Sequence, residues 1–340
     1  MKAIWTALAM GLAVLSPFAG TPASAQTAQK WSFIITRPNL NSFDDQQTQA
    51  AFDRVRNRTQ GALDIKTVFT GSLPIKETEW LRAVRNGDLE MAVITGDYHA
   101  GDFPLLGLIQ TPFLFKDQVE KNIGIAASFP VMQREANKLG VQLLAARPYA
   151  EIGFWTTEPI PDITKLAGRK IRAQAKLFSD MVEAAGGVPV PVAFAEAYTA
   201  LQSGLVKGIF TGFDSITAGK LHEVAPYAYG IRLANQFPYI GVNKQKWDAL
   251  PAETRTIMME ELNRGMQVIQ ANVPNLMTDE IAKQKAGGLK AYNPDPPAGW
   301  FELMSEKVAK PTLAAELKRS GQGGEDLLVA IEAGIGRKVR

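Results

Sequence analysis

Short apolar segments alternate with amphipathic segments along the first part of the chain, and this alternation restricts the possible folds more than any other feature. Three segments have the composition of strands: 31–36, 62–71 and 90–95. Two segments between them have helical periodicity: 42–60, with Ser42 or Asp44 as cap, and 76–89, ending at Gly87. Strands separated by helices at this spacing are typical of βαβ units. The sequence therefore predicts an α/β fold with a largely parallel sheet.

The same helix–strand unit recurs 117 positions later in the sequence. EWLRAVRNG (79–87) and EAYTALQSG (196–204) share Glu, Ala and Gly at matching positions, and each precedes an apolar segment that ends in Thr-Gly. A chain of 340 residues is long enough for two domains. Two similar α/β units on one chain are consistent with two lobes and a ligand cleft between them.

The first 25 residues have the features of a cleaved signal peptide. Lys2 is followed by an apolar run over 4–15, and Ala23-Ser24-Ala25 forms a small-x-small cleavage pattern. The alternative is a membrane anchor, but spanning a bilayer takes roughly 20 apolar residues and this run is shorter. We therefore expect export and a mature chain that begins at Gln26.

Charge and reactive side chains leave few classes of function open. Removing residues 1–25 takes away one cation and leaves 36 Lys and Arg against 34 Asp and Glu, with no basic block, which disfavours nucleic-acid binding. There is no cysteine, and His99 and His222 are expected to be surface or structural groups. Acidic neighbours such as Asp44 and Asp45 are expected to be solvated or to start helices. We expect no catalysis and no cofactor or metal.

The segment GRKIRAQ (168–174) has the alternation of a strand and carries three cations. Because side chains alternate along a strand, Lys170 and Arg172 share one face and Ile171 points to the other. A helical segment follows at 175–187, so Arg172 lies near the carboxyl end of the strand, where open α/β sheets bind ligands. A surface Arg or an ion-paired Arg fits the same spacing, since most Arg residues are exposed.

Five segments resemble the solute-binding proteins of TRAP transporters, in the DctP-like family. The most specific is VPVPVAFAEAYTALQSGLVKGIF (188–210), which contains an E-x-Y-T-A-L-Q-x-G helix. The others are GSLPIKETEWLRAVRNGDLEMAV (71–93), LIQTPFLF (108–115), LAGRKIRA (166–173) and VNKQKWDALPAETRTIM (242–258). They lie between residues 71 and 258 and agree with the family in order and spacing.

This resemblance implies an α/β, two-lobed periplasmic binding protein of the type II-like, Venus-flytrap class with a long connecting helix, for which 251–273 is the candidate. Lobe I would contain 26–150 and 238–278, and lobe II would contain 151–237 and 279–340. The protein would capture an organic carboxylate and deliver it to TRAP membrane subunits, as a monomer rather than a dimer. The alternative is an exported hydrolase or lyase that acts on a small organic acid.

In proteins similar to this one, the Arg of the corresponding strand binds the ligand carboxylate, and the matching residue here is Arg172. A guanidinium group meets both carboxylate oxygens, whereas Lys170 offers a point charge and is expected to face solvent. Trp155 stands where many relatives have a second Arg, and Thr211 where many have Asn. Losing a cation and gaining aromatic residues favours an aromatic or apolar monocarboxylate.

The remaining candidate contacts also have structural explanations. Trp155, Phe210 and Phe213 are candidate walls of the ligand site, and ordinary core packing explains Phe210 and Phe213 equally well. Three weaker candidates are Arg37 and Asn39, which follow the first strand, and Glu79, which lies at a helix start. A loop Arg, a turn Asn and a Glu in a helix's first turn all occur without any ligand.

Overall fold

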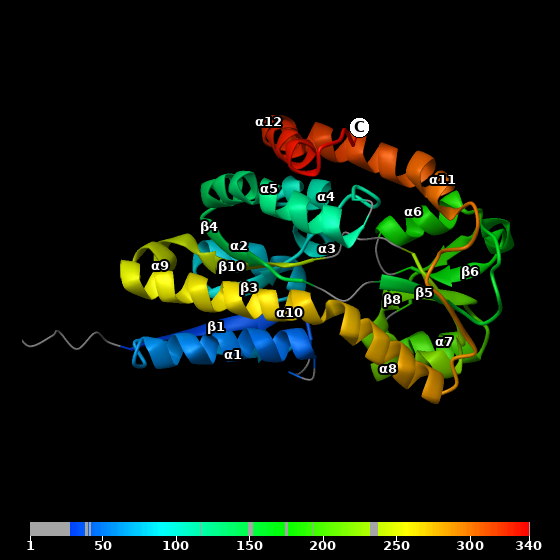
Figure 1. The fold of residues 1–340 in the computed structure, drawn as a ribbon, viewed down its shortest axis with the longest axis horizontal. Coiled ribbons are helices and arrows are strands. Elements are labelled where there is room, and N and C mark those ends of the chain that lie inside the picture. The colour runs from blue at the N-terminus through cyan, green and yellow to red at the C-terminus, as the bar shows by residue number, and fades with distance from the viewer. Residues whose placement is uncertain are drawn as a thin grey trace, which may run out of the picture.

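The computed structural model describes residues 28–37, 40, 42–115, 117–148, 152–173, 176–192, 194–231 and 237–339. The chain forms two lobes, each built around one sheet, and helix α10 (Ala252–Ala286) runs along both of them (Figure 1). The expected signal peptide and candidate residue Asn39 lie outside the described residues. Within the described ranges, no helix combines the length and the apolar character needed to cross a membrane.

Lobe I is built on a five-stranded sheet in the order β2-β1-β3-β10-β4. Its strands are β1 (Gln29–Ile35), β2 (Leu63–Phe69), β3 (Met91–Ile94), β4 (Val141–Ala146) and β10 (Tyr239–Asn243). β1 pairs in parallel with β2 and β3, and β10 pairs antiparallel with β3 and β4. The parallel part of the sheet is the part that the sequence predicts. β10 completes the sheet only after the chain has passed through lobe II.

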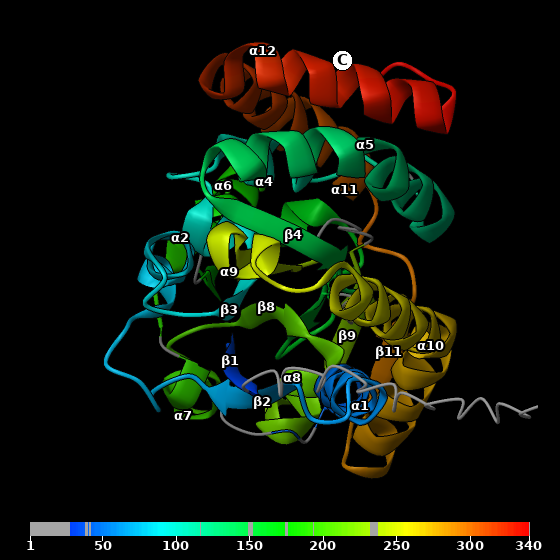
Figure 2. The same ribbon diagram turned by 90° about the vertical axis from the view of Figure 1, so that its left-hand side faces the viewer.

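Helices cover both faces of the lobe I sheet. They are α1 (Phe43–Arg58), α2 (Trp80–Asn86), α3 (Gly96–His99), α4 (Pro104–Ile109), α5 (Gln118–Lys138) and α9 (Lys244–Asp248). α1 begins after Ser42, whose hydroxyl accepts a hydrogen bond from the backbone N–H of Asp45. α1 and α10 pack together on one side of the sheet, while α5 covers β4 on the other side (Figure 2).

Lobe II repeats this plan around a six-stranded sheet in the order β11-β9-β5-β8-β6-β7. Its strands are β5 (Ile152–Thr156), β6 (Lys170–Arg172), β7 (Val188–Val190), β8 (Gly208–Gly212), β9 (Tyr227–Gly230) and β11 (Ala291–Asn293). Its helices are α6 (Lys176–Ala184), α7 (Ala197–Gln202), α8 (Phe213–Ala218) and α11 (Trp300–Met304). Parallel pairs join β7, β6 and β8, and antiparallel pairs join β8, β5 and β9, as in lobe I.

The sequence repeat corresponds to a repeated structural unit. In each copy a short 3-10 turn leads into a helix, α2 or α7, and the helix is followed by a strand, β3 or β8. Gly87 and Gly204 end the two helices with φ angles of 88° and 75°. These angles lie in the left-handed region that glycine adopts without strain, and this explains the shared Gly in the two segments.

The last helix packs on a different lobe from the one expected. Helix α12 (Lys310–Ile335) follows α11 and the π-helical turn Ser305–Ala309, and it packs on α4 and α5 of lobe I (Figure 2). Its apolar residues Leu313, Leu327 and Leu328 are buried in the lobe I core. The assignment of 279–340 to lobe II is therefore wrong for α12, because this helix buries its apolar side on the first lobe.

Candidate functional site

The parallel strands of both sheets end at the junction of the lobes. Arg37 lies two residues beyond the end of β1, and Asp214 lies two residues beyond the end of β8. Arg37 Nη2 donates a hydrogen bond to Asp214 Oδ2 at 3.2 Å, which joins lobe I to lobe II. The strand ends at which open α/β sheets bind ligands therefore meet between the two lobes.

Arg172 is the last residue of β6, and only 3% of it is exposed. As the alternation predicts, Ile171 points to the opposite face and enters the lobe II core. Lys170 is exposed, which agrees with the expectation that it faces solvent. Arg172 Nε donates a hydrogen bond to Val192 O at 2.9 Å, and its guanidinium carbon lies 5.8 Å from the centre of the Phe194 ring. Burial lowers the pKa of Arg172. These contacts hold a cation in a defined orientation at a strand end.

Trp155 and Thr211 lie on the same face of the sheet as Arg172. In the strand register Ile209 lies between Trp155 and Arg172, and side chains in register share a face. Trp155 is fully buried, and its Nε1 donates a hydrogen bond to Gln284 Oε1 of α10 at 3.2 Å. Its position next to a ligand stays a prediction.

Phe213 packs edge-on against Trp155, with 4.7 Å between the ring centres. Both rings belong to the cluster of buried residues beneath α8. Core packing, which the sequence left open for Phe213, therefore accounts for the contacts of this ring.

Phe210 lies on the other face of the sheet. Its ring stacks on Phe154 at 4.4 Å and on Phe178 at 5.5 Å between ring centres, in the core of lobe II. Since side chains alternate along β8, Phe210 points away from the side that Ile209 and Thr211 occupy. Core packing again accounts for its contacts, and the expected wall beside Arg172 is not where this ring lies.

Arg37 is held by acidic residues at the start of α1. Its Nη1 donates hydrogen bonds to Asp44 Oδ2 and Asp45 Oδ2, both at 2.8 Å. Arg147, which follows β4 and is buried, pairs with the same two carboxylates. Burial alone would raise the pKa of Asp44, but Arg147 and Arg37 outweigh it and lower the pKa to about 2.

Asp44 and Asp45 lie in the first turn of α1, so the expectation that they start a helix is confirmed. The expectation that they are solvated is wrong, because both are buried ion-pair partners. Arg147 stands about a hundred residues from them in the sequence, so only the folded sheet brings this cation to the start of α1.

Glu79 is exposed, and its Oε2 accepts a hydrogen bond from the backbone N–H of Lys76 at 3.0 Å. This contact matches the plain explanation of Glu79 as a residue that starts a helix. A contact between Glu79 and a ligand stays a prediction.

Two residues that the sequence did not single out contact candidate site residues. Phe194 is 41% exposed and its ring lies beside the guanidinium group of Arg172. Asp214 reaches Arg37 across the lobes. Asp214 stands two residues after a strand that ends in Thr-Gly, which was a usable signal, whereas nothing in the periodicity marks Phe194.

His99 is fully buried, and both of its ring nitrogens lie against backbone groups. Nε2 lies 2.9 Å from Glu77 O, and Nδ1 lies 3.0 Å from Thr95 O and 3.1 Å from the backbone nitrogen of Thr95. Burial lowers the pKa of His99. In the described part of the chain, no group of three or more His, Cys, Asp or Glu residues could hold a metal ion.

His99 should make the protein less stable in mild acid. Its pKa in the folded state lies below the unfolded value of about 6.5, so the folded protein favours the neutral ring. Above that pH, the stability that depends on the neutral ring is fully present. This stability is lost as the pH falls through the folded pKa. Urea unfolding at pH 7.5 and pH 5 should show a smaller pH effect in His99→Gln than in the wild type. Equal pH effects in the two proteins would contradict a buried neutral His99.

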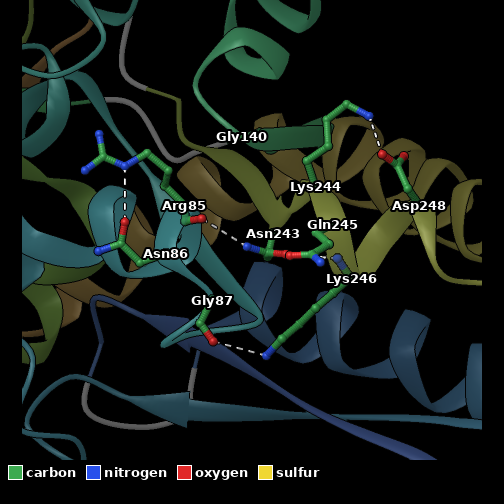
Figure 3. A pocket seen from close by; sticks show the side chains of 9 residues that line it. All are labelled: Arg85, Asn86, Gly87, Gly140, Asn243, Lys244, Gln245, Lys246 and Asp248. Carbon is green, nitrogen blue, oxygen red and sulfur yellow. Dashed lines mark hydrogen bonds and ion pairs between the residues drawn. The ribbon is translucent and has the colours of Figure 1, made fainter.

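A hollow of about 650 Å³ lies at the opposite edge of lobe I (Figure 3). It lies at the carboxyl end of β10. Because β10 runs antiparallel to β3, this end lies at the edge of the sheet opposite to the carboxyl end of β3, away from the junction of the lobes. Its polar groups bind one another: Lys244 pairs with Asp248, and Lys246 Nζ donates to Gly87 O (Figure 3). These internal contacts explain the positions of Lys244 and Lys246 without a ligand.

Comparison with known proteins gives one family. The family model of bacterial extracellular solute-binding proteins, family 7 (DctP), matches residues 41–312. The C4-dicarboxylate-binding periplasmic protein DctP of Rhodobacter capsulatus is 27% identical over 294 residues, which cover 78% of this chain and 84% of that protein.

Solved structures share the fold. An extracytoplasmic solute receptor of Bordetella pertussis that binds pyroglutamic acid has a TM-score of 0.77 and 23% identity, over 90% of this chain and 100% of that one. A TRAP periplasmic solute-binding protein of Desulfovibrio salexigens with bound orotic acid has a TM-score of 0.79 and 22% identity, over 90% and 98%. These likenesses confirm the expected two-lobed α/β fold.

Proposed function

Since the chain belongs to family 7 of the bacterial extracellular solute-binding proteins, we propose that it is the monomeric receptor of a TRAP transporter for an aromatic or apolar monocarboxylate. The family consists of periplasmic binding proteins, so the protein is a receptor and not an enzyme. The alternative of an exported hydrolase or lyase is therefore set aside. The receptor takes up a small organic acid and passes it to the membrane subunits.

The observation that carries the proposal is Arg172. A buried guanidinium group at a strand end is poorly solvated, so a carboxylate that arrives there gains more than it would at the surface. The hydrogen bond from Nε to Val192 O fixes the plane of the group. A carboxylate that meets the fork in this plane would form two parallel hydrogen bonds, which a Lys at the same position could not form.

The charge at the junction supports a ligand with a single carboxylate. Arg37 and Arg147 bring two cations, and Asp44, Asp45 and Asp214 bring three anions. A second ligand carboxylate near Arg37 would compete with these three anions. Trp155, which stands where many relatives have a second Arg, adds no positive charge.

The ring of Phe194 supports an aromatic or apolar ligand body. It is the exposed aromatic side chain that lies beside Arg172, so a ligand bound there would cover it. Burying this ring would gain roughly 25 cal/mol for each Å² of apolar surface, and stacking would add about 0.5 to 1.5 kcal/mol. Trp155 and Thr211 lie on the same face of the sheet as Arg172, and Phe213 of α8 packs on Trp155.

A thermal-shift screen tests this ligand class. Orotate, phenylacetate and isovalerate should raise the melting temperature more than succinate, malate or sialic acid, because at equal concentration a ligand that binds the folded state more tightly stabilises it more. Phe194→Ala should reduce the advantage of the aromatic acids over isovalerate. If succinate or malate gives the largest shift, the proposed charge selectivity is wrong.

A further inference from the structure

Two exposed aromatic rings lie beyond the ends of parallel strands, one in each lobe. In the part of the chain that the structure describes, the two most exposed aromatic side chains are Tyr98, at 44%, and Phe194, at 41%. We propose that Tyr98 is a specificity-determining residue that forms a second wall of the ligand site, so that a flat acid lies between its ring and that of Phe194. This inference rests on the proposed function, which supplies the carboxylate on Arg172 and the first wall.

The strand that precedes Tyr98 places this residue at the junction. Tyr98 belongs to α3, which begins two residues after the end of β3. β3 runs parallel to β1, so its carboxyl end lies at the same edge of the sheet as Arg37, which reaches Asp214 of lobe II. Figure 1 shows α3 on the side of lobe I that faces lobe II.

The neighbours of Tyr98 in α3 are turned toward lobe I. A Cβ atom at Gly96 would lie 2.9 Å from the backbone oxygen of Leu106 in α4, and α4 packs into the lobe I core. His99 is fully buried, with Nε2 against Glu77 O. Because successive residues of a helix are about 100° apart, Tyr98 projects from the side of α3 opposite to Gly96, away from α4. At this end of the sheet, that direction leads into the junction.

A ligand held by Arg172 would use both rings. The guanidinium carbon of Arg172 lies 5.8 Å from the centre of the Phe194 ring, so a carboxylate bound to Arg172 brings the rest of the ligand over this ring. The other face of a flat ligand is then turned toward lobe I. Periplasmic binding proteins close their two lobes around the ligand, and this closure brings Tyr98 onto the second face.

Two aromatic walls favour a flat ligand over a puckered one. An aromatic ring stacks on a wall at each of its faces, whereas a saturated ring of similar size cannot stack on either. The ring of Tyr98 should therefore determine how strongly the receptor prefers aromatic acids to saturated cyclic acids.

Phenylacetate and cyclohexylacetate test the second wall, since each has one carboxylate and a six-membered ring and only the ring of phenylacetate is flat. Calorimetric titration gives both affinities, and their ratio cancels the contribution of the carboxylate. The wild type should bind phenylacetate more tightly. Tyr98→Leu keeps an apolar side chain without the aromatic face, so the preference for phenylacetate should fall by about 2- to 10-fold. Tyr98→Phe should keep the wild-type preference.

Tyr227→Leu provides the matched control. Tyr227 is half-buried and pairs with Thr156 of β5, which in turn pairs with Gly208, the first residue of β8. This is the end of the lobe II sheet opposite to the junction, so Tyr227→Leu should leave the preference unchanged. Because Tyr98 is exposed, Tyr98→Leu should keep the wild-type melting temperature in the absence of ligand.

The outcomes separate this inference from the proposed function. If phenylacetate binds and Arg172→Ala weakens its binding, but Tyr98→Leu keeps the wild-type preference, the second wall is refuted and the proposed function stands. The second wall is also refuted if Tyr227→Leu lowers the preference as much as Tyr98→Leu does. If neither acid binds, or if both bind equally well to Arg172→Ala, the proposed function is wrong and the second wall is wrong with it.

Discussion

Replacing Arg172 by alanine should weaken binding of the best monocarboxylate by about 2 to 5 kcal/mol, which corresponds to a loss of roughly 30-fold to several thousand-fold in affinity. In the variant, the ligand carboxylate would enter the junction without the buried guanidinium group that we propose as its partner. Calorimetric titration of the wild type and the variant with the acid that gives the largest thermal shift measures this loss directly.

Two further variants make the test specific to the fork of Arg172. Arg172→Lys should restore only part of the affinity, because an ammonium group cannot form the two parallel hydrogen bonds. Lys170→Ala removes an exposed cation two residues earlier on the same strand and should leave affinity unchanged. Unchanged affinity in Arg172→Ala would remove this residue from the site.

Replacing Phe210 by alanine should lower the free energy of unfolding by about 3 to 5 kcal/mol, with or without ligand. The ring is fully buried between Phe154 and Phe178, so its removal leaves a cavity in the lobe II core. Urea unfolding followed by circular dichroism measures the change.

Phe194→Ala is the matched comparison for Phe210→Ala. Phe194 is partly exposed, so its truncation should cost far less stability while it weakens binding of aromatic acids. If instead Phe210→Ala changes ligand preference and leaves stability intact, Phe210 lines the site and our description of the two sheet faces is wrong.

The local features of the site could be predicted from the sequence because they depend on short-range periodicity. The alternation over 168–174 places Arg172 on one face and Ile171 on the other, and the following helix places Arg172 at the strand end. The same rule, applied to β8, would have separated Phe210 from Thr211. Phe210 was expected to line the ligand site because it is aromatic, and the side of the sheet to which it points was not considered.

The ion pairs of the junction could not be predicted from the sequence because they join distant segments. Arg37, Asp44 and Arg147 come from the ends of two strands and the start of a helix, and Asp214 comes from the other lobe. No local pattern determines which carboxylate meets which cation. The packing of α12 on lobe I has a similar origin, since its apolar stripe fits a helix layer on either lobe until the fold is known.

A crystal structure of the protein with its co-purified ligand tests the central claim most directly. We predict density for one carboxylate against the guanidinium group of Arg172, with the apolar body of the ligand lying on the Phe194 ring. Arg37 should remain bound to Asp44, Asp45 and Asp214, as it is here. A ligand whose carboxylate binds away from Arg172, or whose second carboxylate displaces Asp214 from Arg37, would contradict the account.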